Sequence, residues 1–272
     1  MLLIVGGNSY LAKKWISHNR GFLAKKFIIS SKSSDGDICL NLRNDMNLDD
    51  IPKNITRAII FAGISSHEVC KRNYIEAWKI NVEGTNKLIK KLNKKGIKCL
   101  FLSSNAVFSN QTEFTGETNE RLPDSNYGKL KVEAEDLLLK NPINSVLRIT
   151  KVLDNESKII KSWHKSLSKS IPIEVFNDLR VAPIRSIHVV NQINFWIKNE
   201  FNGIFHLSSS YDLTYYDFAC EFAIRNFYNK NLIIPRKVID KIEDLEYKPR
   251  KANLDCKYEQ SYAINNIQFW EN

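Results

Sequence analysis

Short apolar segments alternate with amphipathic ones along the first two-thirds of the chain, and this alternation is the strongest constraint on its fold. The segments are rich in Ile, Val, Leu and Phe and lack polar alternation, which predicts strands buried on both faces. They read "LLIVGG" (2–7), "KFIISS" (26–31), "AIIFAG" (58–63), "KCLFLSS" (98–104) and "NSVLRIT" (144–150). Buried strands separated by helices indicate an α/β fold with a parallel, doubly wound sheet.

The segment 75–96, "IEAWKINVEGTNKLIKKLNKKG", repeats apolar residues three and four apart and ends on Gly96, which predicts a helix. After about residue 155 the alternation loosens. Three further helices are expected in "KIIKSWHKSLSKS" (158–170), "IHVVNQINFWIKN" (187–199) and "TYYDFACEFAIRNF" (214–227), with strand segments in 171–184 and 203–210.

Composition narrows the function classes. The net charge of +10 comes from lysines spread along helical stretches, and no aromatic-basic interleaving suggests nucleic-acid binding. No apolar run reaches the roughly 18 residues of a membrane span. The start, "MLLIVGGNSYLAKKW", lacks a basic leader and a cleavage site, so we expect a strand and no signal peptide. Five dispersed cysteines without C-x-x-C spacing predict reduced thiols in a cytoplasmic protein and no metal site.

A glycine turn, "VGGNSYLA" (5–12), stands where the first strand meets the first helix. A dinucleotide-binding turn needs small residues so that the backbone can approach a pyrophosphate at the helix N-terminus. Its three glycine places hold Gly6, Ser9 and Ala12 here, all of them small. A plain strand-turn-helix remains the alternative.

The end of the second strand predicts which nicotinamide cofactor is used. An acid there accepts from the ribose hydroxyls of NADH, whereas a basic residue favours the extra phosphate of NADPH. The segment "FIISSKS" offers Ser31 and Lys32 and has no acid at its tip. We therefore expect NADPH, with NADH possible, although an exposed loop would read the same way.

Tyr127 and Lys131 lie four residues apart in "SNYGKLKVEAE", on one face of a predicted helix. A tyrosine with a pKa of about 10 is a poor proton shuttle, but an ammonium one turn away favours its ionised form. Ser103 and Ser104 end a buried strand, at the edge where doubly wound sheets bind ligands, and a hydroxyl there can hold a carbonyl oxygen. Each feature is common alone; their order after a glycine turn is more specific.

Together these motifs resemble the extended short-chain dehydrogenase/reductase family, over nearly the whole chain. The matching segments are "GGNSYLA", "FAG" (61–63), "NVEGTNKL" (81–88), "SSNAVF", "YGKLKVEAE", "VLRITKVL", "DLRVAPI" and "GIFHLS". Within that family the chain is most similar to the dTDP-4-dehydrorhamnose reductase group, which reduces nucleotide-linked 4-keto-6-deoxy sugars. The resemblance implies a Rossmann-type dinucleotide-binding domain over 1–155, with segments near 181–208 returning to it. It also implies a smaller, interwoven substrate lobe over 156–272.

The resemblance also implies roles for single residues. The implied catalytic set is Ser104, Tyr127 and Lys131. The implied cofactor contacts are Gly6, Ser9, Tyr10, Leu11, Ser31, Lys32, Ala62, Gly63, Ser103, Tyr127 and Lys131. For the substrate we expect contacts from Ser65, His67, Asn105, Arg180 and Arg250, the two arginines pairing with phosphates.

The residues after Ser104 separate the reactions of the family. Related 4,6-dehydratases carry an Asp-Glu pair where this chain has Asn105 and Ala106, and epimerase-reductases of the GDP-fucose type have a cysteine in place of Ala106. UDP-galactose-type epimerases usually have an acid at the second strand, where this chain has Ser31. Simple carbonyl reduction of a nucleotide-linked sugar therefore fits best. The alternatives are a nucleotide-sugar epimerase and a non-catalytic regulatory subunit.

The resemblance also suggests an assembly. In many family members the Tyr-Lys helix pairs across a dimer interface with the helix that corresponds to 75–92. We therefore expect a homodimer.

Overall fold

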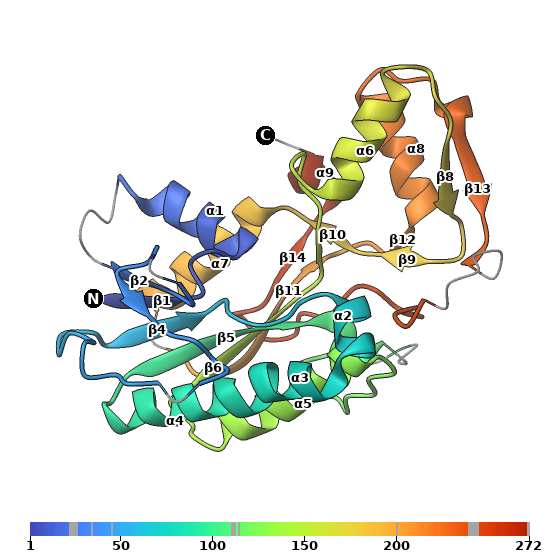
Figure 1. The fold of residues 1–272 in the computed structure, drawn as a ribbon. Coiled ribbons are helices and arrows are strands. Elements are labelled where there is room, and N and C mark those ends of the chain that lie inside the picture. Colours follow the sequence, from blue (N-terminus) through green and yellow to red (C-terminus); the bar gives the residue numbers. More distant parts are fainter. Residues whose placement is uncertain are drawn as a thin grey trace.

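The computed structural model describes residues 1–21, 27–33, 35–44, 46–109, 113, 115–199, 201–238 and 245–270. In these residues an eight-stranded sheet forms the centre of the molecule, and all its neighbouring strands are parallel (Figure 1). Its order is β14 (Tyr262–Ile264), β11 (Gly203–Ser209), β6 (Ser145–Ile149), β5 (Lys98–Ser104), β4 (Arg57–Ile60), β1 (Leu2–Val5), β2 (Phe27–Ser31) and β3 (Ile38–Cys39). The predicted α/β fold with a doubly wound parallel sheet is confirmed.

Helices cover both faces of this sheet. On one face lie α1 (Tyr10–Asn19) and α7 (Ser186–Lys198); on the other lie α3 (Tyr74–Trp78), α4 (Thr85–Lys94) and α5 (Asn126–Leu139) (Figure 1). Successive residues of β1 enter opposite cores, Leu2 and Ile4 with one set of helices, Leu3 and Val5 with the other. This two-sided burial is the reason why the strand sequences are continuously apolar.

The single helix expected over 75–96 is built in three parts. α3 leads into a π-helical turn, Lys79–Gly84, and then into α4, and α2 (His67–Arg72) precedes them. Gly84 lies so close to the 40–44 loop that a Cβ on it would meet the Leu42 carbonyl oxygen at 2.0 Å. Gly96 has φ +75°, in the left-handed region expected of a glycine that follows a helix.

A smaller lobe stands over the carboxyl ends of the central strands, at the upper right of Figure 1. It contains α6 (Lys158–Leu167), α8 (Tyr215–Arg225), the parallel pair β8 (Ile173–Phe176) and β13 (Ile233–Arg236), and the antiparallel pair β9 (Arg180–Val181) and β12 (Leu213–Thr214). The remaining elements are β7 (Lys151–Val152) paired with β10 (Pro183–Ile184), the 3-10 turns Asn105–Phe108 and Lys230–Leu232, and α9 (Asn266–Trp270). Because β11 and β14 belong to the central sheet and α7 covers it, the chain passes between the two parts more than once.

None of the described helices is both long and apolar enough to span a bilayer.

Candidate active site

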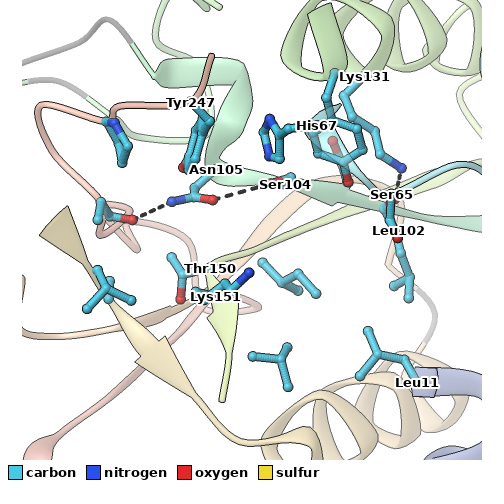
Figure 2. A pocket seen from close by; sticks show the side chains of 18 of the residues that line it. Leu11, Ser65, His67, Leu102, Ser104, Asn105, Lys131, Thr150, Lys151 and Tyr247 are labelled. Carbon is cyan, nitrogen blue, oxygen red and sulfur yellow. Dashed lines mark hydrogen bonds between the residues drawn. The ribbon is translucent and has the colours of Figure 1, made fainter. Parts of the chain in front are cut away.

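A cavity of about 440 Å³ opens between the carboxyl ends of the central strands and the smaller lobe (Figure 2). The chain order of the strands reverses beside β1, and ligands of doubly wound sheets bind in the crevice at such a point. The predicted site residues that line this cavity are Ser9, Tyr10, Leu11, Ser65, His67, Ser103, Ser104, Asn105, Tyr127, Lys131 and Arg180. Those outside its lining are Gly6, Ser31, Lys32, Ala62, Gly63 and Arg250.

Ser104 is the last residue of β5 and caps the 3-10 turn that follows. Its Oγ accepts a hydrogen bond from the Ala106 amide at 3.2 Å and donates to Asn105 Oδ1 at 3.3 Å. The Asn105 amide in turn donates to the Ala252 carbonyl at 2.6 Å. These contacts hold the Ser104 hydroxyl at the cavity wall.

Tyr127 reaches the same wall because α5 starts close to the 3-10 turn that follows β5. The Ser125 hydroxyl caps the helix by accepting from the Gly128 amide at 3.1 Å. A Cβ on Gly128 would meet the Ala106 carbonyl oxygen at 2.4 Å, so only glycine permits this approach. The approach places the Tyr127 phenol beside Ser104.

Lys131 lies one turn further along α5 and points to the end of β5. Its ammonium donates to the Leu102 carbonyl oxygen at 2.7 Å (Figure 2). It also lies 4.3 Å from the centroid of the Phe101 ring and 5.6 Å from that of Tyr127. Ser104, Tyr127 and Lys131, the set that the family resemblance implies, therefore converge in space.

The electrostatics of the pair differ from the expectation that Lys131 lowers the pKa of Tyr127. Burial, followed by the nearby Cys70, raises the pKa of Tyr127, and the Ser104 hydroxyl is the group that opposes the rise. Burial also lowers the pKa of Lys131 to about 8. The reason for the difference is that both groups lie deep in the protein, where desolvation disfavours each charged form. Tyr127 is thus a neutral phenol near pH 7, the form that can give a proton.

His67 is held between two aromatic rings. Its imidazole lies 4.6 Å from the Tyr127 ring and stacks on Tyr247 at 4.4 Å, centroid to centroid. Burial and then the Lys151 ammonium lower the pKa of His67 to about 4. Its buried Nδ1 has no hydrogen-bond partner among the described residues. His67 is therefore a neutral ring that lines the cavity beside Tyr127.

The two arginines expected to bind phosphate behave differently. Arg180 lines the cavity, but its guanidinium donates to the Asp212 carboxylate at 2.9 Å and to the Asp212 carbonyl oxygen at 2.6 Å. Arg250 is exposed outside the cavity lining, and its backbone amide donates to the Ser109 carbonyl at 3.3 Å. The geometry therefore gives Arg250 no position at this cavity.

The glycine turn leads directly into the cavity. Gly6 has φ +82°, and a Cβ on it would lie 2.7 Å from Cα and N of Ala62. Ser9 caps α1, because its hydroxyl accepts a hydrogen bond from the Ala12 amide at 3.2 Å. This cap explains why a serine occupies the place of the second glycine. Tyr10 donates to Asp154 at 2.5 Å. A turn without a Cβ at its tightest point, with a helix N-terminus at the cavity, fits the pyrophosphate of a dinucleotide.

Ala62 and Gly63 lie beneath this turn at the end of β4. The Asn81 side-chain amide fixes the backbone there, accepting from the Ile64 amide at 2.7 Å and donating to the Ile64 carbonyl at 2.8 Å. This contact explains the asparagine of the "NVEG" motif. Both residues support the turn without lining the cavity.

The end of β2 carries an acid that was not expected. The Asp35 carboxylate accepts from Asn8 of the glycine turn at 2.6 Å, from Ser33 Oγ at 2.7 Å, and from Ser31 Oγ. Hydrogen bonds from Ser31, then Asn8 and Ser33, lower the pKa of Asp35. The premise that no acid lies at this tip is therefore wrong, because the chain turns back after Lys32 and brings Asp35 to it. Lys32 itself is exposed.

Several cavity residues carried no recognisable motif. Tyr247, Pro249 and Ala252 come from the irregular tail, and Lys151 comes from the two-residue strand β7. Lys151 does lie inside the segment "VLRITKVL" that resembles a family landmark, but its side chain carried no separate signal. Tyr247 had none.

Three comparisons place the chain among known proteins. A family model described as the RmlD substrate binding domain matches residues 1–272. The solved dTDP-4-dehydrorhamnose reductase of Yersinia enterocolitica is similar with a TM-score of 0.81 at 18% identity, over 98% of this chain and 95% of that one. The dTDP-4-dehydrorhamnose reductase of Bacillus anthracis in complex with NADP gives 0.78 at 16%, over 94% and 90%. MoeE5 in complex with UDP-glucuronic acid and NAD gives 0.79 at 16%, over 94% and 90%. At these identities the likeness shows the fold.

Among curated proteins the chain is similar to methionine adenosyltransferase 2 subunit beta of Pongo abelii and of Bos taurus. Each is 25% identical over 199 residues, 69% of this chain. The match spans 59% of the length of those relatives.

Proposed function

The chain belongs to the RmlD substrate binding domain family, within the extended short-chain dehydrogenases/reductases, and we propose that it is a nicotinamide-dependent reductase of a nucleotide-linked keto sugar. One observation carries the proposal: Ser104, Tyr127 and Lys131 meet at the cavity into which the glycine turn opens. Solved proteins of the same fold are complexes with NADP or NAD, which supports a nicotinamide cofactor. We propose a 4-keto-6-deoxy sugar as the substrate, from the reductases that share the fold.

The proposed reaction is the reduction of a ketone to a secondary alcohol. When bound, the reduced nicotinamide supplies a hydride for the keto carbon and becomes oxidised. Tyr127 gives its phenolic proton to the carbonyl oxygen and is reprotonated from solvent. Ser104 holds that oxygen by a hydrogen bond. Lys131 binds the cofactor ribose through hydrogen bonds from its ammonium.

Two charged residues at the end of β2 act in opposite directions on cofactor choice. Lys32 favours the 2′-phosphate of NADPH, and this remains the reason to propose NADPH. The Asp35 carboxylate can accept from a ribose hydroxyl and repels that phosphate, so it favours NADH. We propose that NADPH is used, that NADH is accepted, and that Asp35 limits the preference.

A second candidate is a non-catalytic member that binds a partner protein. The observation in its favour is the similarity to the beta subunit of methionine adenosyltransferase 2. It leaves unexplained why all three catalytic side chains line one cavity. An epimerase remains a third reading of the same residues.

The direct test is to incubate the protein with reduced cofactor and a dTDP-linked or UDP-linked 4-keto-6-deoxy sugar. Oxidation of the cofactor is monitored through the absorbance of the reduced nicotinamide. We expect the oxidation to match, mole for mole, the alcohol formed. A product epimerised without net cofactor oxidation would favour the epimerase. Cofactor binding without turnover of either keto sugar would favour the non-catalytic candidate.

A further inference from the structure

The charge of the cavity is one-sided. Its lining holds three cationic side chains, Lys131, Lys151 and Arg180, and neither Asp nor Glu among the described residues. A cavity of this kind attracts anions and disfavours neutral ligands that would leave its cations unpaired.

Two of the three cations have partners inside the protein. Lys131 donates to the Leu102 carbonyl, and Arg180 is paired with the Asp212 carboxylate. Lys151 has no ion pair or hydrogen bond within the part of the chain that the structure describes. Its ammonium is therefore the cation left for a ligand.

Lys151 is directed to the reacting end of the cavity. It lies on β7, directly after β6 and Thr150, and Figure 2 shows its ammonium pointing into the space beneath Ser104 and Asn105. It is close enough to His67 to lower the pKa of that ring, and His67 lies against Tyr127. A group bound to Lys151 therefore belongs to the sugar that Tyr127 would protonate, and the remote parts of a nucleotide lie elsewhere.

Lys151 is an exposed residue, so its ammonium is open to solvent and can reach a ligand. The protein atoms around it still lower its pKa by partial desolvation. An anion at hydrogen-bond distance would favour the ammonium form, because the two would share a charge-assisted hydrogen bond.

From this arrangement we infer that the cavity selects a nucleotide-linked sugar that bears a carboxylate, and that Lys151 is the residue that binds it. The inference rests on the proposed reduction of a nucleotide-linked keto sugar, and it replaces the 6-deoxy sugar named above by a sugar that bears a carboxylate. The same chemistry could come from the phosphate next to the sugar, so the experiment must separate the two sources.

The test compares a nucleotide sugar that bears the carboxylate with one that lacks it, and with the nucleotide alone. UDP-glucuronic acid, UDP-glucose and UDP, and the corresponding dTDP compounds, are titrated by calorimetry into the cofactor-loaded protein. We expect the uronic acid to bind about tenfold or more tightly than the glucose compound, which corresponds to about 1.4 kcal/mol. Lys151→Met should remove this difference, and Lys151→Arg should keep most of it.

The matched control is Lys161→Met on α6, an exposed lysine outside the cavity lining. It removes the same charge and should preserve the difference between the two sugars. Equal affinity of the two sugars for wild type, a preference that survives Lys151→Met, or no binding of any of these ligands would overturn the inference. A loss of affinity in Lys151→Met that is as large for UDP alone would assign the residue to phosphate and overturn it too.

Failure of the inference is distinguishable from failure of the proposed function. If the protein reduces neutral keto sugars with kinetics that do not depend on Lys151, the reductase stands and the acidic substrate falls. If it binds the uronic acid through Lys151 but turns over no keto sugar, the inference about the carboxylate stands and the proposed reductase falls.

Discussion

The imidazole of His67 packs against the phenol ring of Tyr127, with the ring centroids 4.6 Å apart. Because His67 is neutral near pH 7, it brings no positive charge that would ionise the phenol. Tyr127 stays protonated in the free protein, ready to act as an acid in a reduction. For the reverse oxidation the protein would first have to remove that proton, so the site is better prepared for reduction.

Replacing Tyr127 with Phe removes this proton and little else. Turnover of a keto sugar should fall by roughly 10² to 10⁴, as is typical for the loss of a general acid. Cofactor binding and thermal unfolding should stay near wild type, because only one hydroxyl is lost. Steady-state kinetics and a cofactor titration on the same preparation test this. Near wild-type turnover would remove Tyr127 from the mechanism.

Lys131 should make cofactor binding depend on pH. Its pKa is lowered from the usual value to about 8, so the ammonium is present below that pH and is lost as the pH rises through it. If the ammonium binds the cofactor ribose, the dissociation constant should rise roughly tenfold toward pH 10, the effect of losing one charged hydrogen bond. Fluorescence titration with NADPH from about pH 6.5 to about pH 10 measures this.

The control for that titration is Lys131→Arg, whose guanidinium stays charged throughout. Its dissociation constant should show no rise above pH 8 relative to its own value at pH 7. A flat profile for the wild type would contradict the role given to Lys131.

Asp35 should limit the use of NADPH. Asp35→Asn removes the negative charge at the end of β2 and keeps the shape of the side chain, so the ratio of NADPH to NADH affinity should rise about tenfold or more. Calorimetric titration of both cofactors measures the ratio. Asp50→Asn, an exposed acid in the 46–51 loop, is the control for net charge and should leave it unchanged. A ratio equal to that of wild type would place Asp35 outside the cofactor site.

The exposed apolar side chains near α3 give a test of the expected homodimer. Ile75 is 72% exposed, with Tyr74 and Val69 also partly open, on helices that pack against α5. If α3 to α5 form the interface, wild-type protein at micromolar concentration should scatter light as twice 31.5 kDa, and Ile75→Asp as one chain. A single-chain mass for the wild type would contradict the dimer.

The sequence predicts the parts of this fold that repeat a local pattern. The five apolar strands and the helical segment before Gly96 follow from periodicity and turn chemistry. Each depends on neighbours a few residues away, and a single sequence shows such relations directly. The set of Ser104, Tyr127 and Lys131 spans more of the chain and followed from the order of its motifs and the family resemblance.

Other features depend on chain segments that meet only in three dimensions. Tyr247 stacks on His67 across 180 positions of sequence, and the pairing of Arg180 with Asp212 depends on the antiparallel contact between β9 and β12. The sequence did not indicate Asp35 as a residue of the cofactor site, because it lies past the end of β2. Its carboxylate is held near the strand end by hydrogen bonds that it accepts from Asn8 and Ser31. No local pattern encodes such contacts, so the electrostatics of the site required the structure.

Among the strands of the central sheet, β14 is the last to be synthesised. It pairs with β11 at the edge of the sheet, and Ser261 just before it donates to the buried Glu117 at 2.5 Å. On the ribosome, β1 to β6 emerge and can collapse long before residues 262–264 exist. Until then the outer edge of β11 is an unpaired row of backbone groups that other nascent chains can join. Translation that stalls before this strand should therefore yield chains in which the glycine turn is formed but the edge of β11 is unpaired and prone to aggregation. Chaperones would have to cover that edge.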